Sequence, residues 1–370
     1  MTLRVLALAS YPSRMASTRF RVSQFIEPLR ARGIEMELLS WLDDELAATF
    51  YDGKGWWCKA QRMLSCTTSM LRDVLRRSDY DVLMVHREAA LVGPPLLELL
   101  ASRAGRVPIV FDIDDATWVA LGPWLRDLAR LPWKASALVR VAQEVVVGSQ
   151  FLAGWARNRA KNVTVIPTVV PAAVWTPRCC RIEGRFAGDV PVVGWIGSHS
   201  TAVTLLRVLP ALRRLRTEGY TFCFRVIGAA SSFDLEGFSA ERIPWREDLE
   251  MDMFRDIDIG LAPMLDGPFQ HGKCAFKQIQ YMTVGVPHVS SWVGGARDFV
   301  KHDVNGLVAR DEEGWYRSIR CLLEDESLRA RLSVEGRKLV EQELSAEVMV
   351  ERMADVLLRA KRGFVHGCCR

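Results

Sequence analysis

The chain has 370 residues, of which 49% are hydrophobic and 25% charged, with nine cysteines and a formal net charge of +5. This length exceeds the usual single core, so two domains are expected, and the absence of any CxxC pair argues against a zinc site or a disulfide framework. The basic residues are scattered among acids, which disfavours nucleic acid as a partner, and no apolar run is long enough for a signal-peptide core or a membrane span. We therefore expect a cytoplasmic protein with two domains.

Short aliphatic runs alternate with helical segments through the first half, as in βα units around a parallel sheet. A strand over 4–10 is followed by a helix over 17–33 that ends at Gly33. Further strands are predicted at 81–86, 108–113, 144–149 and 163–168. These elements predict a Rossmann-like domain over residues 1–175.

A second series of the same kind follows a stretch rich in proline, glycine and charge at 171–190, which is typical of a connection between domains. Its strands are predicted at 191–198, 221–228, 258–264 and 287–291, and a long amphipathic helical tail at 327–362. We expect a second Rossmann-like domain over 176–345 and a tail over 346–370 that packs back on the first. Open α/β sheets bind ligands at the carboxyl ends of their strands, so the site is expected in a cleft between the domains.

The stretch "VVGWIGSHSTAV" runs from a strand through small residues into a helix. Backbone N–H groups and hydroxyls at a helix N-terminus suit a phosphate, here with Gly197, Ser198, Ser200 and Thr201. The alternative is an ordinary βα turn in which a hydroxyl caps the helix.

Two lysines four residues apart, Lys273 and Lys277, come just before a helix that carries Gln280 and ends at Gly285. Two ammonium groups on one face can neutralise a diphosphate. The alternative is a solvated helix face.

The segments "GWIGSHST", "DIGLAPM", "GKCAFKQIQYMTVGVP" and "VTVIPT" resemble the retaining nucleotide-sugar glycosyltransferases of family four, which have the GT-B fold. The resemblance covers nearly the whole chain and is most specific over 190–310. It implies that Gln280 stands where the second glutamate of a Glu-x7-Glu motif contacts the donor ribose. The first glutamate would fall at Gly272, so the two lysines carry more of the diphosphate charge.

In the first half, "DYDVLMVHREA" resembles the family strand whose terminal histidine lies beside the transferred sugar, and this residue is His86. Arg87 and Glu88 follow it and are placed on the acceptor side. The loop "SRMASTRFRV" contains Arg19 and Arg21, which can reach a phosphate or an acidic acceptor; the alternative is the basic first turn of a helix. The segment 51–81 mixes Trp56 and Trp57 with basic residues, as an interfacial membrane helix does; the alternative is a helix whose tryptophans lie in the core.

The stretch "IVFDIDDATW" places Asp112, Asp114 and Asp115 directly after a strand, and four interpretations are open. The first is a metal site of the GT-A type, and the second is the DxD nucleophile motif of haloacid-dehalogenase phosphatases. The third is a repelling cluster facing the acceptor, which orients hydroxyls or raises one carboxyl pKa for proton transfer. The fourth is structural capping, above all by Asp115.

Together these features predict a cytoplasmic GT-B glycosyltransferase that can contact an anionic membrane at its inner face and needs no metal or other cofactor. It transfers a sugar from a nucleoside diphosphate sugar to a hydroxyl of a saccharide or lipid-linked acceptor with retention, in polysaccharide or glycolipid synthesis. His86, Asp112 and Asp114 are the predicted catalytic residues. The alternatives are a GT-B-fold sugar-nucleotide epimerase and a non-catalytic nucleotide-sugar-binding subunit.

Overall fold

The computed structural model describes residues 2–50, 55–77, 79–119 and 131–368, and the chain divides into two compact units. Unit 1 comprises Met1–Thr168 and Met349–Arg370, and unit 2 comprises Val169–Val348. Each unit is described by itself below. No helix in the described part of the chain combines the length and apolarity needed to cross a membrane.

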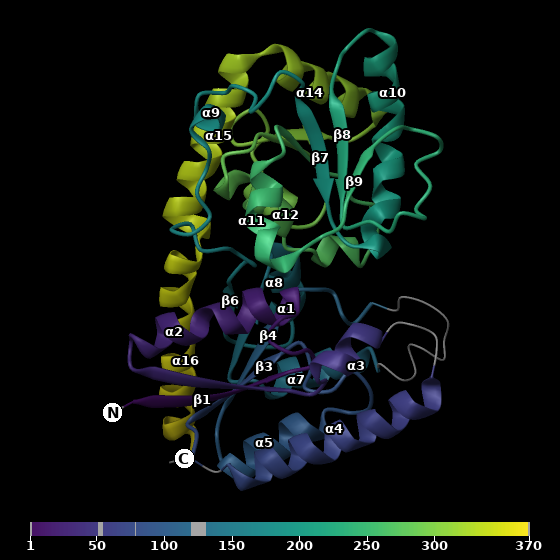
Figure 1. The fold of residues 1–370 in the computed structure, drawn as a ribbon. Coiled ribbons are helices and arrows are strands. Elements are labelled where there is room, and N and C mark those ends of the chain that lie inside the picture. The colour runs from purple at the N-terminus through teal and green to yellow at the C-terminus, as the bar shows by residue number, and fades with distance from the viewer. Residues whose placement is uncertain (1, 51–54, 78, 120–130, 369–370) are drawn as a thin grey trace. The chain divides into compact units, whose positions relative to one another are not determined.

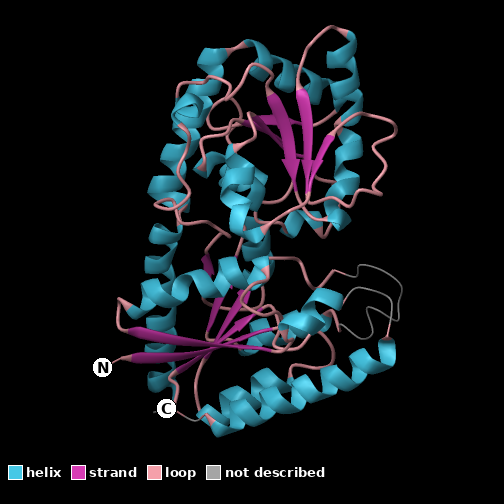
Figure 2. Cartoon of the chain, viewed as in Figure 1, coloured by secondary structure: helices cyan, strands magenta, loops and turns pink. Residues whose placement is uncertain are grey.

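Unit 1 contains a parallel sheet of six strands in the order β2-β1-β3-β4-β5-β6 (Figures 1 and 2). Their bounds are β1 Leu3–Ala9, β2 Ile34–Ser40, β3 Val82–His86, β4 Ile109–Ile113, β5 Glu144–Val147 and β6 Val163–Val165. The central strands β3, β4 and β5 are buried at every residue, because helices cover both faces of a parallel sheet. The core of unit 1 therefore follows the aliphatic runs read from the sequence.

Helices connect these strands in the βα pattern. They are α1 Ala16–Thr18 and α2 Gln24–Arg30 after β1, α3 Asp44–Thr49 and α4 Trp56–Arg76 after β2, α5 Leu96–Gly105 after β3, α7 Trp133–Val141 after β4, and α8 Gln150–Arg157 after β5. The helix predicted over 17–33 is found as one continuous helical run from Ala16 to Arg30, in which a π-helical turn at Arg19–Ser23 joins α1 to α2. That turn carries both arginines of the predicted phosphate loop.

Unit 2 repeats this architecture with a parallel sheet in the order β12-β11-β10-β7-β8-β9. Its strands are β7 Val192–Ile196, β8 Cys223–Ile227, β9 Glu241–Ile243, β10 Ile259–Ala262, β11 His288–Ser291 and β12 Leu307–Ala309. Its helices are α9 Cys179–Ile182, α10 Leu209–Thr217, α11 Glu250–Arg255, α12 Phe276–Thr283, α13 Ala296–Phe299, α14 Glu312–Glu324 and α15 Glu326–Leu339. Short 3-10 helices lie at His199–Arg207, Glu247–Leu249 and Gln270–Gly272. Trp195, Phe224 and Trp315 are among the large side chains of its core.

The C-terminal part of the chain forms two helices. After α15 and a π-helical turn at Val340–Leu344, Ser345 adopts an extended conformation and the long helix α16, Ala346–Cys368, begins. The Ser345 hydroxyl accepts a hydrogen bond from the backbone N–H of Val348 at 3.3 Å, so it caps the new helix. Most of α16 belongs to unit 1, where Arg359 pairs with Glu144 at 3.1 Å.

Candidate functional site

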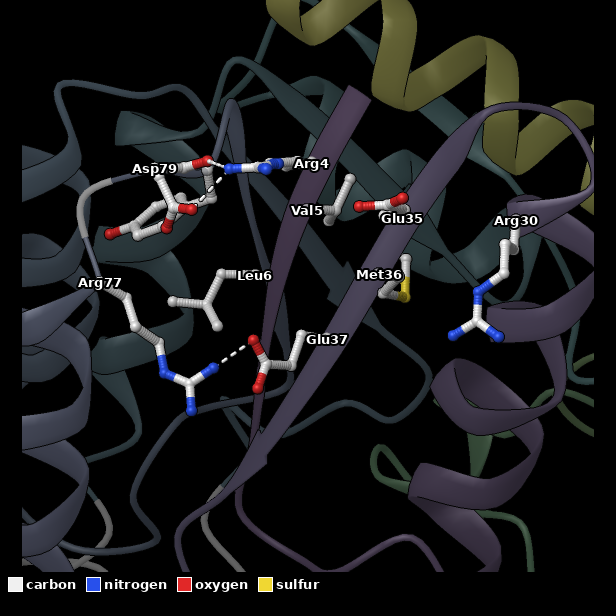
Figure 3. Close-up of a pocket in the computed structure, with 10 residues that line it drawn as sticks. Arg4, Val5, Leu6, Arg30, Glu35, Met36, Glu37, Arg77 and Asp79 are labelled. Carbon is white, nitrogen blue, oxygen red and sulfur yellow. Dashed lines mark hydrogen bonds and ion pairs between the residues drawn. The ribbon is translucent and has the colours of Figure 1, made fainter. Parts of the chain in front are cut away.

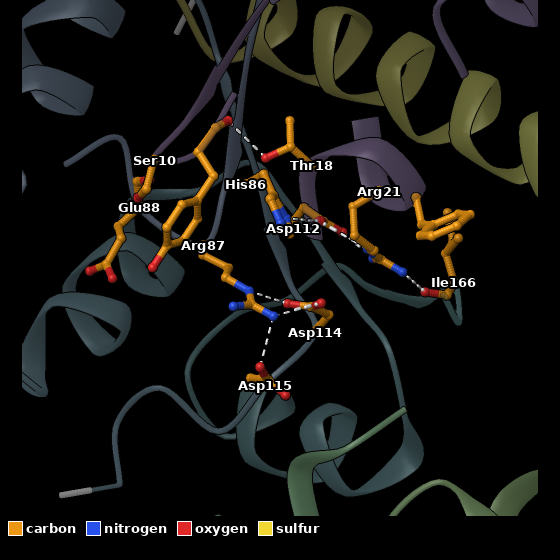
Figure 4. Close-up of polar contacts among 12 residues, drawn as sticks. Ser10, Thr18, Arg21, His86, Arg87, Glu88, Asp112, Asp114, Asp115 and Ile166 are labelled. Carbon is orange, nitrogen blue, oxygen red and sulfur yellow. Dashed lines mark hydrogen bonds and ion pairs between the residues drawn. The ribbon is translucent and has the colours of Figure 1, made fainter. Parts of the chain in front are cut away.

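The carboxyl ends of β3 and β4 bring the predicted residues of unit 1 together (Figure 4). The two strands are parallel neighbours, and their register pairs His86 with Asp112. Nδ1 of His86 lies 2.7 Å from Oδ2 of Asp112, and both side chains are buried. Two residues predicted separately from the ends of two strands are thus in direct contact.

Arg21 is the third member of this buried network. Its guanidinium binds Asp112 through two nitrogens, with Nε at 3.1 Å from Oδ2, and its Nη1 donates to the carbonyl of Ile166 at 2.5 Å. Burial disfavours the charged Asp112, but the Arg21 guanidinium and the hydrogen bond from His86 outweigh it and lower the pKa of this carboxyl. The Arg21 guanidinium is thus an internal counter-ion, and its predicted contact with a phosphate or an acceptor stays a prediction.

The other ring nitrogen of His86, Nε2, takes no part in these hydrogen bonds. It is buried, and no hydrogen-bond partner for it exists among the residues that the structure describes. Because Nδ1 is held by a carboxylate, the ring is oriented and its tautomer is set, with Nε2 available to a hydroxyl. Nε2 is therefore the atom of this network that can form a hydrogen bond with a ligand.

A second arginine pairs with the other two aspartates. Arg87 has a left-handed backbone, with φ of 59°. Its Nε and Nη2 bind the two carboxylate oxygens of Asp114 at 2.5 and 2.9 Å, and Nη2 also binds Oδ2 of Asp115 at 2.7 Å (Figure 4). Burial again opposes charge, but Arg87 outweighs it and holds the pKa of Asp114 well below its usual range. The repelling cluster with a raised carboxyl pKa is wrong, since each carboxylate is paired with an arginine.

The structure also bears on the metal and acceptor roles predicted at this edge of the sheet. Among the described side chains, no three His, Cys, Asp or Glu residues are grouped so as to hold a metal ion. Glu88 follows Arg87 and lies 4.0 Å from Nζ of Lys134, while its carbonyl accepts from the Ser10 hydroxyl at 2.6 Å. The guanidinium of Arg19 lies 4.4 Å from the ring centre of Phe20. The acceptor-side role of Arg19 and Glu88 stays a prediction.

A hollow on unit 1 contains none of the predicted site residues. It is lined by residues of β1 and β2 with Arg30, Arg77, Asp79 and Tyr80 (Figure 3). Arg4 pairs with Asp79 at 2.5 Å, and Arg77 pairs with Glu37. These two ion pairs lie within the wall, whereas Arg30 pairs with Glu27 outside it, and we assign the hollow no role.

In unit 2 the loop after β7 brings glycine backbone close to the Trp195 ring and to neighbouring backbone. A Cβ at Gly197 would lie 2.5 Å from the Trp195 ring, and one at Gly228 would lie 2.4 Å from the carbonyl of Gly197. The following Ser198 begins a 3-10 helix instead of the expected α-helix. Its hydroxyl lies 3.0 Å from that of Ser200 and 3.3 Å from that of Thr201, so the predicted hydroxyls form one exposed cluster.

Lys277, the second of the two predicted lysines, lies near the Trp195 ring that contacts this loop. Nζ of Lys277 lies 5.7 Å from the centre of a Trp195 ring, and no carboxylate among the described residues pairs with it. Burial, and then the charge of Lys273, lower the pKa of Lys277 to about 8. A half-buried ammonium without a protein anion beside a second ammonium is an arrangement that an anionic ligand stabilises.

Gly272 and Gln280, the two residues that depart from the Glu-x7-Glu motif, lie close to these lysines in the sequence. Gly272 ends a 3-10 helix, and Gln280 is buried on α12. Nε2 of Gln280 donates to Oε1 of Glu250, at the start of α11, at 3.2 Å. Glu250 and Trp195 were missed by the sequence prediction; Trp195 stands in the quoted motif, whereas nothing in the sequence singles out Glu250.

Comparison with known proteins adds to this geometry. Residues 190–325 match the family model of glycosyl transferases group 1, which covers less than half of the chain. The matched segment lies within unit 2 and contains the Gly197 loop, both lysines and Gln280. No curated protein sequence matches the chain.

Solved structures resemble the chain over nearly its full length. A glycosyltransferase from Rickettsia africae has a TM-score of 0.69 and 13% identity, covering 97% of this chain and 98% of that one. HepE from Anabaena, in complex with UDP-glucose, has a TM-score of 0.66 and 15% identity, covering 96% and 99%. The catalytic domain of starch synthase IV from Arabidopsis thaliana, bound to ADP and acarbose, has a TM-score of 0.68 and 14% identity, covering 98% and 100%. The predicted GT-B fold is confirmed.

Proposed function

We propose that this protein is a glycosyltransferase that takes a sugar from a nucleoside diphosphate sugar and transfers it to a hydroxyl acceptor. The observation that carries the proposal is the Lys277 ammonium, which lies near Lys273 and the Trp195 ring, has no carboxylate partner among the described residues, and has a pKa lowered to about 8. This site lies within the segment that matches group 1 glycosyltransferases. Structural neighbours were solved with UDP-glucose and with ADP, which supports a nucleotide donor.

In the proposed reaction unit 2 holds the diphosphate. Lys273 and Lys277 supply positive charge, and the hydroxyls and N–H groups of the Ser198–Thr201 turn donate hydrogen bonds to phosphate oxygens. As the glycosidic bond to the donor breaks, negative charge grows on the departing diphosphate. Groups already positioned around that charge stabilise the transition state more than the ground state.

The nucleoside is proposed to meet the Gln280–Glu250 pair. Gln280 lacks the charge that the family glutamate brings to the ribose, but its amide is bonded to the Glu250 carboxylate. The pair therefore offers both a carboxylate and an amide to a ribose diol.

Unit 1 is proposed to contact the transferred sugar through Nε2 of His86, which Asp112 and Arg21 hold in place. Asp112 acts through His86 as a positioning residue. Asp114 and Asp115, fixed by Arg87, are proposed to accept hydrogen bonds from acceptor hydroxyls. We further propose transfer with retention, in polysaccharide or glycolipid synthesis, and without a metal, since arginines already engage these carboxylates.

The test is the release of nucleoside diphosphate from UDP- and ADP-sugars in EDTA, with and without candidate sugar acceptors. Lys277→Ala should lower kcat/KM for the donor by roughly a hundredfold or more, because a charge on the leaving group is no longer neutralised. Lys301→Ala, which removes an exposed lysine of the same unit, is the matched control. Near-normal turnover of a folded Lys277→Ala protein would remove the role assigned to this residue, and strict dependence on manganese would contradict the metal-free reaction.

The same assay separates the alternatives. An epimer formed without acceptor indicates an epimerase. Nucleotide binding seen as thermal stabilisation, with no turnover of any donor, indicates a non-catalytic binding subunit.

A further inference from the structure

The outward side of α4 carries a line of large apolar side chains. Trp57, Leu64 and Leu75 are 77%, 66% and 55% exposed. They are spaced about two and about three helical turns apart, so they project from one side of the helix. The opposite side faces the protein, where Met70 and Val74 are buried. The helix is thus anchored on one side and apolar on the other, so the expectation that Trp57 belongs to the core is wrong.

The neighbouring helix α5 extends this apolar surface. The two helices pack against each other and run side by side in unit 1 (Figure 1). Leu96 and Leu100, one turn apart on α5, are 58% and 40% exposed. The only acid of α5, Glu98, turns inward and accepts a hydrogen bond from the N–H of Ala89 at 2.9 Å. We call the five exposed side chains and the arginines below the α4–α5 face, which comprises Trp57, Leu64, Arg72, Leu75, Arg76, Leu96, Leu100 and Arg103.

The charges on this face have one sign. Arg72, Arg76 and Arg103 are exposed, and none forms an ion pair with a carboxylate in the described ranges. By contrast, Arg62 and Arg77 of the same α4 segment pair with Asp43 and Glu37. The outward arginines are therefore uncompensated, while those at the sides of the helix are neutralised.

We propose that the α4–α5 face docks on an anionic lipid bilayer, with α4 lying in the plane of the headgroups. Leucine and tryptophan side chains in a helix of this kind enter the boundary between headgroups and acyl chains. Guanidinium groups bind phosphate in two-pronged geometry, and a negative bilayer surface attracts them. The combination of exposed apolar side chains with unpaired arginines fits this surface better than a neutral protein partner, which would leave the arginines unmatched.

The test is co-sedimentation of the full-length protein with vesicles of phosphatidylcholine alone and of phosphatidylcholine mixed with phosphatidylglycerol. We expect binding to the mixed vesicles that weakens as salt is raised. Arg72→Glu with Arg76→Glu should reduce the partition coefficient by about tenfold or more. Leu64→Ser with Leu75→Ser should reduce it in both low and high salt, because it removes the apolar contribution.

The matched control is Arg352→Glu with Arg362→Glu, which changes two exposed arginines of α16 and alters the net charge by the same amount. It should bind mixed vesicles like the unmodified protein. All four changed arginines are exposed, and circular dichroism with thermal unfolding establishes that each variant is folded. The proposal is overturned if the unmodified protein stays in the supernatant with mixed vesicles, or if the α16 variant loses as much binding as the α4 variant.

Discussion

At the scale of single residues, the most constrained group is the buried ion pair of Arg21 and Asp112. Both side chains are fully inaccessible to solvent. Removing one member leaves the other as a buried charge without a counter-ion, which costs far more than losing an exposed pair. The pair also fixes the ring of His86, so it links stability to the predicted site.

Asp112→Asn should therefore lower the free energy of unfolding by about 3–5 kcal/mol, because Arg21 loses its counter-ion. The matched control is Asp79→Asn, which breaks the exposed pair with Arg4 and should cost about 1 kcal/mol or less. Urea titrations of the two variants make the comparison. Equal costs in the two variants would show that Asp112 is not the counter-ion that the geometry describes.

Lys277 should give the proposed donor site its own pH dependence. With a pKa of about 8, its ammonium loses its proton in the free enzyme as the pH rises past that value. Donor binding needs the charged form, so kcat/KM for the donor should fall above about pH 8 while kcat falls less, since a bound diphosphate raises the pKa of Lys277. Lys277→Arg, whose charge persists at these pH values, should move the decline to higher pH. An unchanged alkaline decline in that variant would assign the titration to another group.

At the scale of elements, the turn after β7 joins the two donor motifs through one aromatic ring. The Trp195 ring lies against the backbone of Gly197, and the ammonium of Lys277 lies 5.7 Å from a ring centre. Glycine is required at 197 because a methyl group there would collide with the ring. Strand β7 and helix α12 are therefore coupled by packing as well as by charge.

The added methyl group of Gly197→Ala should displace the Trp195 ring and thereby shift the Lys277 ammonium that lies near it. We expect kcat/KM for the donor to drop by roughly tenfold to a hundredfold, the range that small misplacements of binding groups produce. Gly188→Ala, where a Cβ has nothing within 4 Å, is the matched control and should leave kinetics unchanged. Equal donor binding and turnover in the two variants would show that the contact between Gly197 and Trp195 does not affect function.

At the scale of the whole molecule, unit 2 is a continuous segment, whereas unit 1 needs two. Unit 2 spans Val169–Val348 and contains its own core and all the predicted donor residues. Unit 1 is completed by α16, which contributes buried Met353, Val356 and Leu357. The order of the chain thus ties the end of the sequence to the first domain.

Residues 169–348 expressed alone should fold cooperatively and gain thermal stability from UDP or ADP, because a ligand that binds the folded state stabilises it. Introducing Lys277→Ala into this fragment should abolish the shift while leaving its unliganded Tm within a few degrees. A fragment with no cooperative thermal transition would mean that unit 2 depends on the rest of the chain.

Much of the fold could be predicted because aliphatic runs in parallel sheets are buried on both faces. "DVLMVH" and "PIVFDI" became β3 and β4 for this reason. Strand β2 was missed, since Glu35 and Glu37 alternate with apolar residues and weaken the run. The sequence predicted the site residues separately, at strand ends and in loops. It could not predict that Arg21 pairs with Asp112, because the two residues are far apart in the sequence and only the folded sheet brings them together.

The sequence by itself determined the two βα series and the positions of His86, Asp112 and Lys277 at the ends of elements, while the GT-B class came from the resemblance of its motifs to a known family. Local periodicity and turn chemistry carry that information. Only the tertiary structure decided the partners of the aspartates: Arg21 binds Asp112, and Arg87 binds both Asp114 and Asp115, so two arginines offset the repulsion that the sequence suggests. It also decided that Trp57 faces outward, because which side of a helix is covered depends on the sheet beneath it.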